Sequence, residues 1–311
     1  MRAKIHLYNI YTRTLKAGRT SIGAMRCCAA AIIVFACQNG LAQTSVRWHN
    51  EASDTTRITK MLTTVSSQGD LSSNQRVAAF AHLLEGTPYA SGTLEGTPEM
   101  LTVNLDSMDC TTFVETVAAM ALTLDEGRNA WQDFIYNLEQ LRYRQGRADG
   151  YASRLHYVSD WIVDNTHRGL LTEVTDRLSG WSHQVKTLDY MSRHRSAYPA
   201  MADDETYEKI KSSEVGFRSH RFPILKSSLM QTKKGEGLLR DGDIVIFTTK
   251  TDGLDASHMG IVAIHSDGKA HVIHASSAAG SVIDDPLTLS EYLRKNHSIN
   301  GIRVIRLGSL R

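Results

Sequence analysis

Two kinds of hydrophobic pattern follow one another along this chain, and their order limits the folds that it can adopt. Between about residues 55 and 149, apolar residues recur three and four positions apart, as at 57–65 and 72–86, which predicts amphipathic helices. The region 150–237 is mixed, with a helix expected at 154–171. Helices first and antiparallel strands last indicate an α+β protein rather than a wound parallel sheet. The strands are expected from β-branched runs between Gly, Asp and Ser turns, at 241–250, 257–265, 270–276 and 301–307.

The N-terminal segment has the pattern of an export signal. Residues 1–26 contain six Lys and Arg and no acidic residue, and an apolar run follows at 27–37. Small residues at Gly40 and Ala42 complete a signal peptide, so we expect cleavage after Ala42 and a periplasmic or otherwise exported protein. The apolar run is too short for a stable membrane span. Lipid anchoring at Cys37 is the alternative.

Removal of residues 1–42 changes the charge and the cysteine content of the chain. The formal net charge falls from +2 to about −4, because the six basic residues leave with the signal peptide. This balance, without a dense basic stripe, argues against a nucleic-acid partner. The remaining 43–311 is interpreted as one domain. Cys110 is then the only cysteine, because Cys27, Cys28 and Cys37 are also lost.

Cys110 lies where an amphipathic helix should begin. Asp109 is a natural N-cap, so Cys110 falls in the first turn. Unpaired backbone N–H groups and the helix dipole there favour a thiolate and lower its pKa. A lone cysteine in an oxidising compartment is an inert buried thiol, half of an intermolecular disulfide, or a nucleophile. The position favours the nucleophile, with the other two open.

A thiolate nucleophile needs a base, and the strand region contains several histidines. Strand alternation puts His258 on one face with Gly260 and Val262, whereas His271 and His274 point to opposite faces. That argues against an H-x-x-H metal pair on this strand. With no H-E-x-x-H or C-x-x-C motif elsewhere in the chain, we expect neither a metal nor a cofactor.

Four motifs in order resemble one known group of enzymes: DCTTFVE (109–115), DGDIVIF (241–247), SHMGI (257–261) and VIHAS (272–276). They are similar to the NlpC-type papain-like amidase and peptidase superfamily. The segment 153–165 resembles its N-acetylmuramoyl-L-alanine amidase-like branch. The resemblance implies a papain-like fold, with a helical lobe that carries Cys110 packed on an antiparallel sheet. It implies Cys110 as nucleophile, His258 as base and His274 as its orienting partner. Tyr89 would line the site, and an insertion at about 140–235 would shape it.

The resemblance also implies the substrate. It points to hydrolysis of peptidoglycan or muropeptide fragments, at the amide between N-acetylmuramic acid and L-alanine. The alternatives are an endopeptidase that cuts γ-D-glutamyl–diamino acid bonds and a non-catalytic wall-binding module. The sequence leaves the oligomeric state undetermined. Besides its N-cap role, Asp109 could hold a free substrate amine. Further candidate substrate contacts are Arg154, His156, Tyr157, Trp161 and Ser257, with 154, 157 and 161 on one helical face.

The register of the last hairpin tests the role of His274. In an antiparallel pair, residues with a constant index sum lie opposite and share a face. A four-residue loop at 266–269 gives a sum of 535 and turns His274 away from His258. A three-residue loop at Asp267–Lys269 pairs 266 with 270, a sum of 536. We predict an even sum, or a bulge that restores it, with both imidazoles close together on the face toward Cys110, because a one-residue slip reverses every side chain. If His274 lies on the far side of the sheet, His271 is the next candidate.

Overall fold

The computed structural model describes residues 45–308, and these residues belong to one compact unit. The predicted signal peptide 1–42 and Cys37 lie outside the described residues. Within the described range, no helix is both long enough and apolar enough to cross a membrane.

The first half of this unit is helical, as the sequence predicts. Asn50 and Ser72 cap the first two helices by accepting backbone N–H groups with their side chains, so both helices begin at their expected polar residues. A short parallel pair of strands, β1 and β2, flanks them. The elements are β1 (Val46–Trp48), α1 (Glu51–Ser66), α2 (Ser73–Leu83), β2 (Leu101–Val103), α3 (Cys110–Asp125) and α4 (Trp131–Arg142).

The C-terminal part forms an antiparallel sheet, so the helix-first, strand-last prediction is confirmed. The sheet has eight strands in the order β4-β5-β10-β6-β7-β8-β9, and β3 pairs with β10 beside that path. Each strand run expected from the sequence is present, while the short β9 was not foreseen. These elements are β6 (Ile244–Thr249), β7 (Ala256–Ile264), β8 (Ala270–Ser276), β9 (Ser281–Asp284), α10 (Leu289–Lys295) and β10 (Ile299–Leu307).

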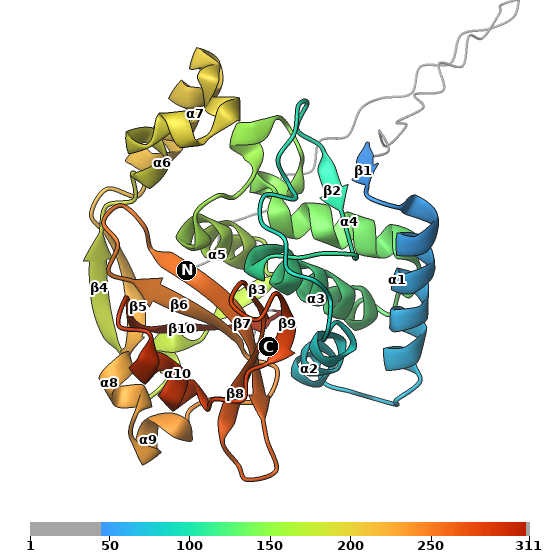
Figure 1. Cartoon of the computed structure of the whole chain (residues 1–311), viewed down its shortest axis with the longest axis vertical. Helices are drawn as coiled ribbons and strands as arrows, with labels where there is room; N and C mark the ends of the chain where they lie inside the picture. The colour runs from blue at the N-terminus through green and yellow to red at the C-terminus, as the bar shows by residue number, and fades with distance from the viewer. Residues whose placement is uncertain (1–44, 309–311) are drawn as a thin grey trace, which may run out of the picture. The chain divides into compact units, whose positions relative to one another are not determined.

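Each face of the sheet has its own hydrophobic core, as strand alternation requires. Met259, Ile261 and Ile273 pack with helices α1–α4 on one face. Val262 and Val272 pack with α8 and α10 on the other. Figure 1 shows α1–α4 grouped beside the sheet and α10 on its other side. The result is helices on both faces of one antiparallel sheet.

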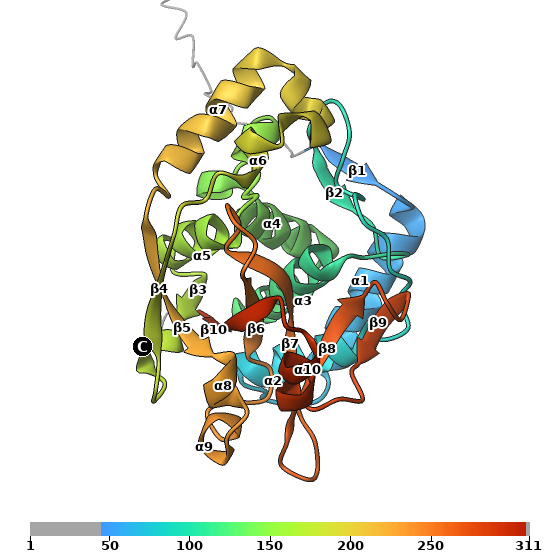
Figure 2. The ribbon, with the colours of Figure 1, turned by 60° about the vertical axis from the view of Figure 1, so that its left-hand side comes forward.

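The region 140–235 extends the sheet and adds a third core. Its strands β3, β4 and β5 continue the sheet beyond β10, and α6 and α7 form an outlying helical group (Figure 2). Tyr157, Leu188, Met191 and Ile210 are among the buried residues of this third core. Its helices and strands are α5 (Val158–His167), β3 (Leu171–Glu173), β4 (Ser182–Lys186), α6 (Tyr190–Arg193), α7 (Asp204–Val215), β5 (His220–Lys226), α8 (Ser227–Met230) and α9 (Lys233–Glu236), with short 3₁₀ turns at Arg144–Gly146, Tyr151–Ser153, Thr175–Arg177, Arg195–Ala197 and Pro199–Ala202.

The helix expected at 154–171 is shorter than predicted. It begins at Val158, with Tyr157 as its N-cap, and residue 154 follows a 3₁₀ turn instead. Arg154, Tyr157 and Trp161 therefore do not share one helical face, and that prediction is wrong. Leu155 and Tyr157 match the apolar spacing of a helix, although they precede its first residue. They are buried by packing against other segments.

The hairpin of β7 and β8 has an even register. Ile261 pairs with Ile273 and Ile264 with Ala270, so the index sum is 534. The prediction of an even sum is confirmed, but the loop is 265–269 rather than the three residues expected. His274 then lies opposite Gly260, where an added Cβ would be 3.0 Å from His274 Cβ and 2.8 Å from Ile273 O. Glycine lets the two strands and the His274 side chain fit at this point.

Candidate active site

Cys110 is the first residue of α3, as the N-cap pattern predicts. Asp109 is in extended conformation and its carboxylate accepts the Thr112 N–H at 2.8 Å. The Thr112 hydroxyl oxygen in turn accepts the Asp109 backbone N–H at 2.9 Å. The two hydrogen bonds together form a capping box. Cys110 is a free thiol of intermediate exposure, so it stands at the positive end of a helix and within reach of solvent.

The electrostatics of Cys110 differ from the expectation of a low pKa. Burial of the sulfur raises the pKa of the Cys110 thiol to about 11, and the Asp109 carboxylate raises it further. Hydrogen bonds to the sulfur from the Met259 backbone and the Thr111 side chain act in the opposite direction. The resting state is therefore a protonated thiol, because desolvation of the charged form outweighs the helix terminus.

His258, His274 and Asp285 form a hydrogen-bonded chain. His258 Nε2 is 2.6 Å from His274 Nδ1, and His274 Nε2 is 3.2 Å from Asp285 Oδ2. An ionised carboxylate only accepts, so His274 donates through Nε2 and accepts from His258 Nε2–H through Nδ1. This arrangement leaves the lone pair of His258 on Nδ1, which is the tautomer that a base needs.

Both imidazoles are held neutral at ordinary pH. Burial lowers the pKa of His258 to about 3, and the neighbouring His274 contributes in the same direction. Burial also lowers the pKa of His274, while the hydrogen bond to Asp285 and its charge partly oppose that shift. The Cys110 thiol and the His258 imidazole are therefore both uncharged at rest.

The paired imidazoles lie on a different sheet face from the one predicted. The His258 ring stacks on Phe247 and the His274 ring meets Tyr292 edge-on, both on the α10 face. Cys110, which packs with the α3 core, is hydrogen-bonded to the backbone of Met259, the residue that follows His258 in β7. Burial raises the pKa of Tyr292 to about 12, and the nearby Asp285 and Cys110 act in the same direction.

An open cleft of about 480 Å³ adjoins the imidazole pair. Ser257 is exposed and lines this cleft together with His258 and His274. Its position agrees with a substrate contact, the role expected for it. The remaining lining residues include Ser276, Ser277, Asp285, Tyr292, Lys295 and Asn296.

Tyr89 lies close to Cys110. Its segment bridges two elements, since Pro88 pairs with Ser281 at the start of β9 and Tyr89 pairs with Met108, two residues before Cys110. Burial raises the pKa of the Tyr89 hydroxyl, and the charges of Cys110 and Asp109 raise it further. Tyr89 is partly exposed, so it is placed to form one wall near the thiol.

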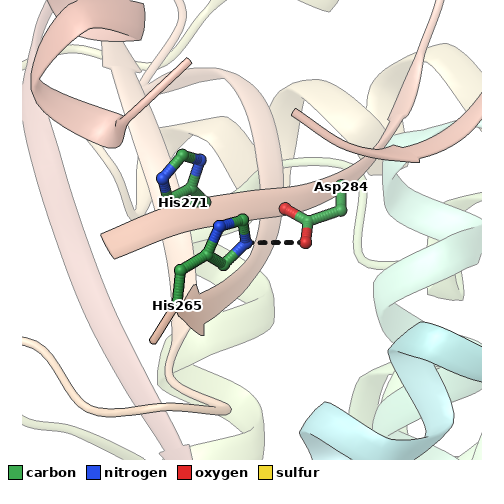
Figure 3. A group of neighbouring side chains, drawn as sticks. All are labelled: His265, His271 and Asp284. Atoms are coloured by element: carbon green, nitrogen blue, oxygen red, sulfur yellow. Dashed lines mark hydrogen bonds and ion pairs between the residues drawn. The ribbon is translucent and has the colours of Figure 1, made fainter. Parts of the chain in front are cut away.

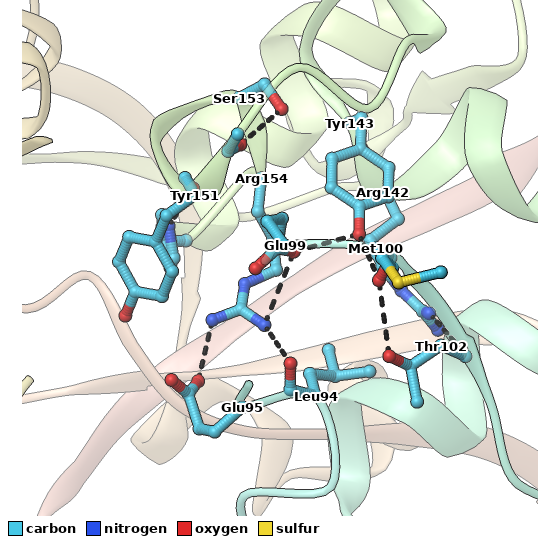
Figure 4. A network of polar contacts seen from close by, with 12 residues as sticks. Leu94, Glu95, Glu99, Met100, Thr102, Arg142, Tyr143, Tyr151, Ser153 and Arg154 are labelled. Carbon is cyan, nitrogen blue, oxygen red and sulfur yellow. Dashed lines mark hydrogen bonds and ion pairs between the residues drawn. The ribbon is translucent and has the colours of Figure 1, made fainter. Parts of the chain in front are cut away.

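Arg154 is buried and holds a loop (Figure 4). Its guanidinium donates to Glu95 Oε1 at 2.6 Å and to the Leu94 carbonyl at 3.0 Å, and it lies 3.7 Å from Glu99. Glu99 also accepts the Tyr143 hydroxyl at 2.8 Å. Arg154 therefore holds segment 94–99 in place through its own hydrogen-bond donors.

The other candidates from this region are also engaged inside the protein. The Tyr157 hydroxyl donates to Glu214 at 2.7 Å and accepts the Met191 N–H at 2.9 Å. Trp161 is 3% exposed within the α1–α4 core. His156 Nε2 donates to the Tyr151 carbonyl at 2.9 Å, and burial lowers the pKa of His156 to about 3. Their role in this structure is support.

Asp285 and Tyr292 are site residues that sequence reasoning missed. Asp285 follows β9 and Tyr292 lies in α10, and both contact His274. No local pattern marks them, because each reaches the site through strand pairing and helix packing. One sequence pattern could have pointed to Asp285: two consecutive aspartates, Asp284 and Asp285, follow a β-branched run. In a strand, consecutive side chains point to opposite faces, so one of the two carboxylates had to face the His274 side of the sheet.

The fold and the site together define a class of protein: an antiparallel sheet covered by helices, with a thiol at a helix start beside paired imidazoles. The chain belongs to the AmiA-like family, described as N-acetylmuramoyl-L-alanine amidase-like, whose model matches residues 79–302. No curated protein matches the sequence.

Solved structures agree with this family. An N-acetylmuramoyl-L-alanine amidase from Bacteroides uniformis is 36% identical, with a TM-score of 0.72, over 76% of this chain and 99% of that one. A Bacteroides fragilis protein named as a candidate xylanase is 39% identical, with a TM-score of 0.69, over 74% and 100% of the two chains. A Legionella pneumophila protein at 20% identity and a TM-score of 0.64, over 83% and 95%, shares the fold.

Proposed function

We propose that this protein is an exported cysteine amidase that hydrolyses peptidoglycan or its muropeptide fragments. Membership of the amidase-like family and the amidase-named structure support a hydrolase acting on this polymer. The observation that carries the cysteine mechanism is the Cys110 sulfur bound by the Met259 backbone, next to the His258–His274–Asp285 chain. Within this proposal the fold is papain-like, of the NlpC type. Residues 1–42 are a signal peptide, and 43–311 form the catalytic domain.

The proton pathway starts from the neutral thiol and the neutral base. His258 Nδ1 takes the proton of Cys110 as the sulfur attacks, and the imidazolium that forms donates through Nε2 to His274. Asp285 fixes the tautomer of His274, and its carboxylate stabilises the positive charge on the paired rings. His274 and Asp285 act as positioning residues, because neither contacts the reacting atoms.

The reaction then proceeds by acyl transfer. The Cys110 sulfur attacks the carbonyl carbon of the amide, and the backbone N–H of Cys110 helps to hold the oxyanion. The carbon–nitrogen bond breaks as His258 protonates the leaving amine, which gives a thioester on Cys110. Water, deprotonated by His258, attacks the thioester, and the carboxylic acid and the free thiol are released.

We propose the amide between N-acetylmuramic acid and L-alanine as the bond that is cut. In that case the lactyl carbonyl of the sugar forms the thioester, and the stem peptide leaves with a free L-alanine amine. The family description and the amidase-named relative favour this bond. The cleft lined by Ser257 and the imidazoles, open to solvent at about 480 Å³, is the part of the site that would receive the sugar or the stem.

Mass spectrometry of defined muropeptides tests the proposal. Incubation with disaccharide-L-alanine substrates should release peptides with a new L-alanine N-terminus and intact disaccharide. Cleavage only within the stem would replace the amidase by a γ-D-glutamyl–diamino acid endopeptidase. Binding to peptidoglycan without any turnover would favour the wall-binding module instead.

The endopeptidase remains the second candidate because of Asp109, whose carboxylate lies next to the Cys110 thiol and influences its pKa. A carboxylate beside the nucleophile can hold a free substrate amine. Such an enzyme needs a stem already stripped of sugar, so a comparison of L-alanine-terminated peptides with disaccharide peptides distinguishes the two specificities. The carboxylate is already used by the Thr112 N–H and hydroxyl, which favours its N-cap role.

A further inference from the structure

A second group of two histidines and one aspartate lies beside the same β7–β8 hairpin that carries His258 and His274: His265 is in its loop, His271 in β8 and Asp284 at the end of β9. Figure 3 shows His265, His271 and Asp284, with a hydrogen bond of 2.8 Å from His265 Nε2 to Asp284 Oδ2. The two rings stack, with centroids 3.7 Å apart and planes 3° apart. One candidate ligand atom from each residue lies within 4.8 Å of the other two. The proposed reaction uses none of these residues.

The sheet register explains why they meet. Ala263 pairs with His271, and His265 lies two residues beyond Ala263, so the two histidines are diagonal neighbours on one face. Ile273 pairs with Asp284, and Ile273 is two residues from His271, so the aspartate joins the same face. No metal is expected from the sequence, because that expectation rests on a pair within one strand and on two sequence motifs, whereas this group combines the β7–β8 loop with β8 and β9.

His271 is already oriented as a metal ligand. Its Nδ1 lies 2.9 Å from the carbonyl oxygen of Asp285. A carbonyl oxygen only accepts, so Nδ1 carries the proton and the lone pair is on Nε2. Metal-bound histidines use their second ring nitrogen in this way, to donate to a carbonyl or a carboxylate.

Asp284 supplies a second, independent observation. Its Oδ1 atom is buried and has no hydrogen-bond partner among the described residues. A buried, unpaired carboxylate oxygen is costly, and a bound cation would remove that cost. The site is also accessible, because the His265 side chain is 38% exposed and the Asp284 side chain 21%.

We propose that His265, His271 and Asp284 bind a zinc ion, with water as the fourth ligand. Two imidazole nitrogens and one carboxylate oxygen suit tetrahedral Zn²⁺, whereas Mg²⁺ and Ca²⁺ require oxygen-rich sites. Tetrahedral zinc needs ligand atoms about 3.3 Å apart, whereas these atoms lie within 4.8 Å of one another and the two rings are parallel, so the ligand atoms must move closer and the rings must turn relative to one another. Rotation of the partly exposed His265 ring at the hairpin loop provides that movement.

The ion would connect the end of the β7–β8 hairpin to β9. Asp285, which follows Asp284, accepts from His274 in the active site, and its carbonyl accepts from His271. Zinc at this place therefore holds the strand end that supports the His258–His274 pair. It has a structural role and takes no part in the bond cleavage.

Isothermal titration calorimetry with ZnCl₂ tests this site in the untagged full chain. All four cysteines are replaced, so that thiols contribute nothing. The expected result is one saturable zinc ion per chain at neutral pH, and thermal unfolding shifted upward by several degrees with excess zinc. His265→Ala, His271→Ala and Asp284→Asn should each weaken binding by about tenfold or more. His271 is buried, so the His271→Ala variant could unfold. In that case His265→Ala, which changes a partly exposed loop residue, still tests the site.

His82→Ala is the matched control, because His82 also pairs with a carboxylate, Glu85, at 2.6 Å on the surface. It should leave zinc binding unchanged. Zinc binding that survives His265→Ala and Asp284→Asn but is lost in His274→Ala would assign the ion to the active-site pair and overturn the proposal. Absence of saturable binding, or equal affinity for Mg²⁺, would overturn it as well.

Discussion

The β7–β8 hairpin carries two histidine pairs, one on each face, and each pair is joined by an aspartate at or directly after the end of β9. The two sets of His, His and Asp have different surroundings. His258 stacks on Phe247, and His274 meets Tyr292 edge-on and is hydrogen-bonded to Asp285. His265 and His271 stack on one another at the open end of the hairpin and connect to Asp284. In each set the two histidines are diagonal neighbours, so the same register builds both.

The groups that contact a histidine pair, and the burial of the pair, decide what chemistry it can perform. The His258 set has a thiol at the adjoining strand margin and burial that keeps the base neutral, which suits proton transfer. The His265 set has an accessible edge and a free lone pair on His271, which suits a metal ion. The consecutive residues Asp284 and Asp285 serve one set each, because strand alternation turns them to opposite faces.

The largest expected effect is the loss of turnover on removal of the thiol or the base. Cys110→Ala and His258→Ala should each lower kcat on a cleaved muropeptide by roughly 10⁴ to 10⁶, because nucleophile and base act as a unit. The double variant should be no slower than Cys110→Ala alone. Chromatographic product assays provide the rates, with His82→Ala as the control that keeps wild-type turnover. Full activity in Cys110→Ala would end the cysteine mechanism.

The next effect concerns Asp285. Asp285→Asn should lower kcat by roughly 10² to 10⁴, since an amide can donate to His274 and favour the wrong tautomer. KM should change little, because Asp285 does not contact the reacting atoms. Asp285→Glu should recover part of the loss, whereas a purely structural residue would show equal damage in both variants. Circular dichroism establishes that the variants are folded.

Thiol reactivity distinguishes the high pKa that burial gives the Cys110 thiol from the low pKa expected at a helix start. Because burial raises the Cys110 pKa to about 11, the thiolate fraction is small at neutral pH and grows as the pH approaches that value. Alkylation by iodoacetamide should therefore accelerate about tenfold per pH unit from pH 7 to 10. Mass spectrometry of the peptide containing Cys110 measures the rate. A rate that is already constant above pH 7 would indicate a resting thiolate.

The smallest expected effect is on acid stability. His258 has a folded pKa of about 3 and an unfolded pKa near 6.5, so the unfolded chain binds the proton first. Its contribution is fully present above pH 6.5 and is lost as the pH falls toward 3, at most about 1.4 kcal/mol per pH unit. His258→Gln should flatten the free energy of unfolding between pH 6.5 and 4, measured by urea denaturation. The exposed His82→Gln should retain the wild-type slope.

Features that depend on neighbouring residues alone, such as helix caps and strand periodicity, could be predicted from the sequence. Asp109 and Cys110 were identified as cap and first helical residue because an N-cap needs only its own helix. The strand runs and the opposite facing of His271 and His274 followed from a two-residue period. The family resemblance then assigned roles to Cys110, His258 and His274. This structure pairs the two histidines and places the Cys110 sulfur against the backbone of Met259, which follows His258.

Only the tertiary structure decided the rest, because it depends on contacts between distant segments. The loop 265–269 fixed the register, β9 brought Asp285 and Asp284 to the two histidine pairs, and packing buried Arg154 on Glu95 and Glu99. Burial also set the protonation of the site, since desolvation of the Cys110 sulfur outweighs the helix terminus that the sequence suggested. Burial and cross-strand distance arise only when the chain is folded, and they determine which of its many histidines can act as a base.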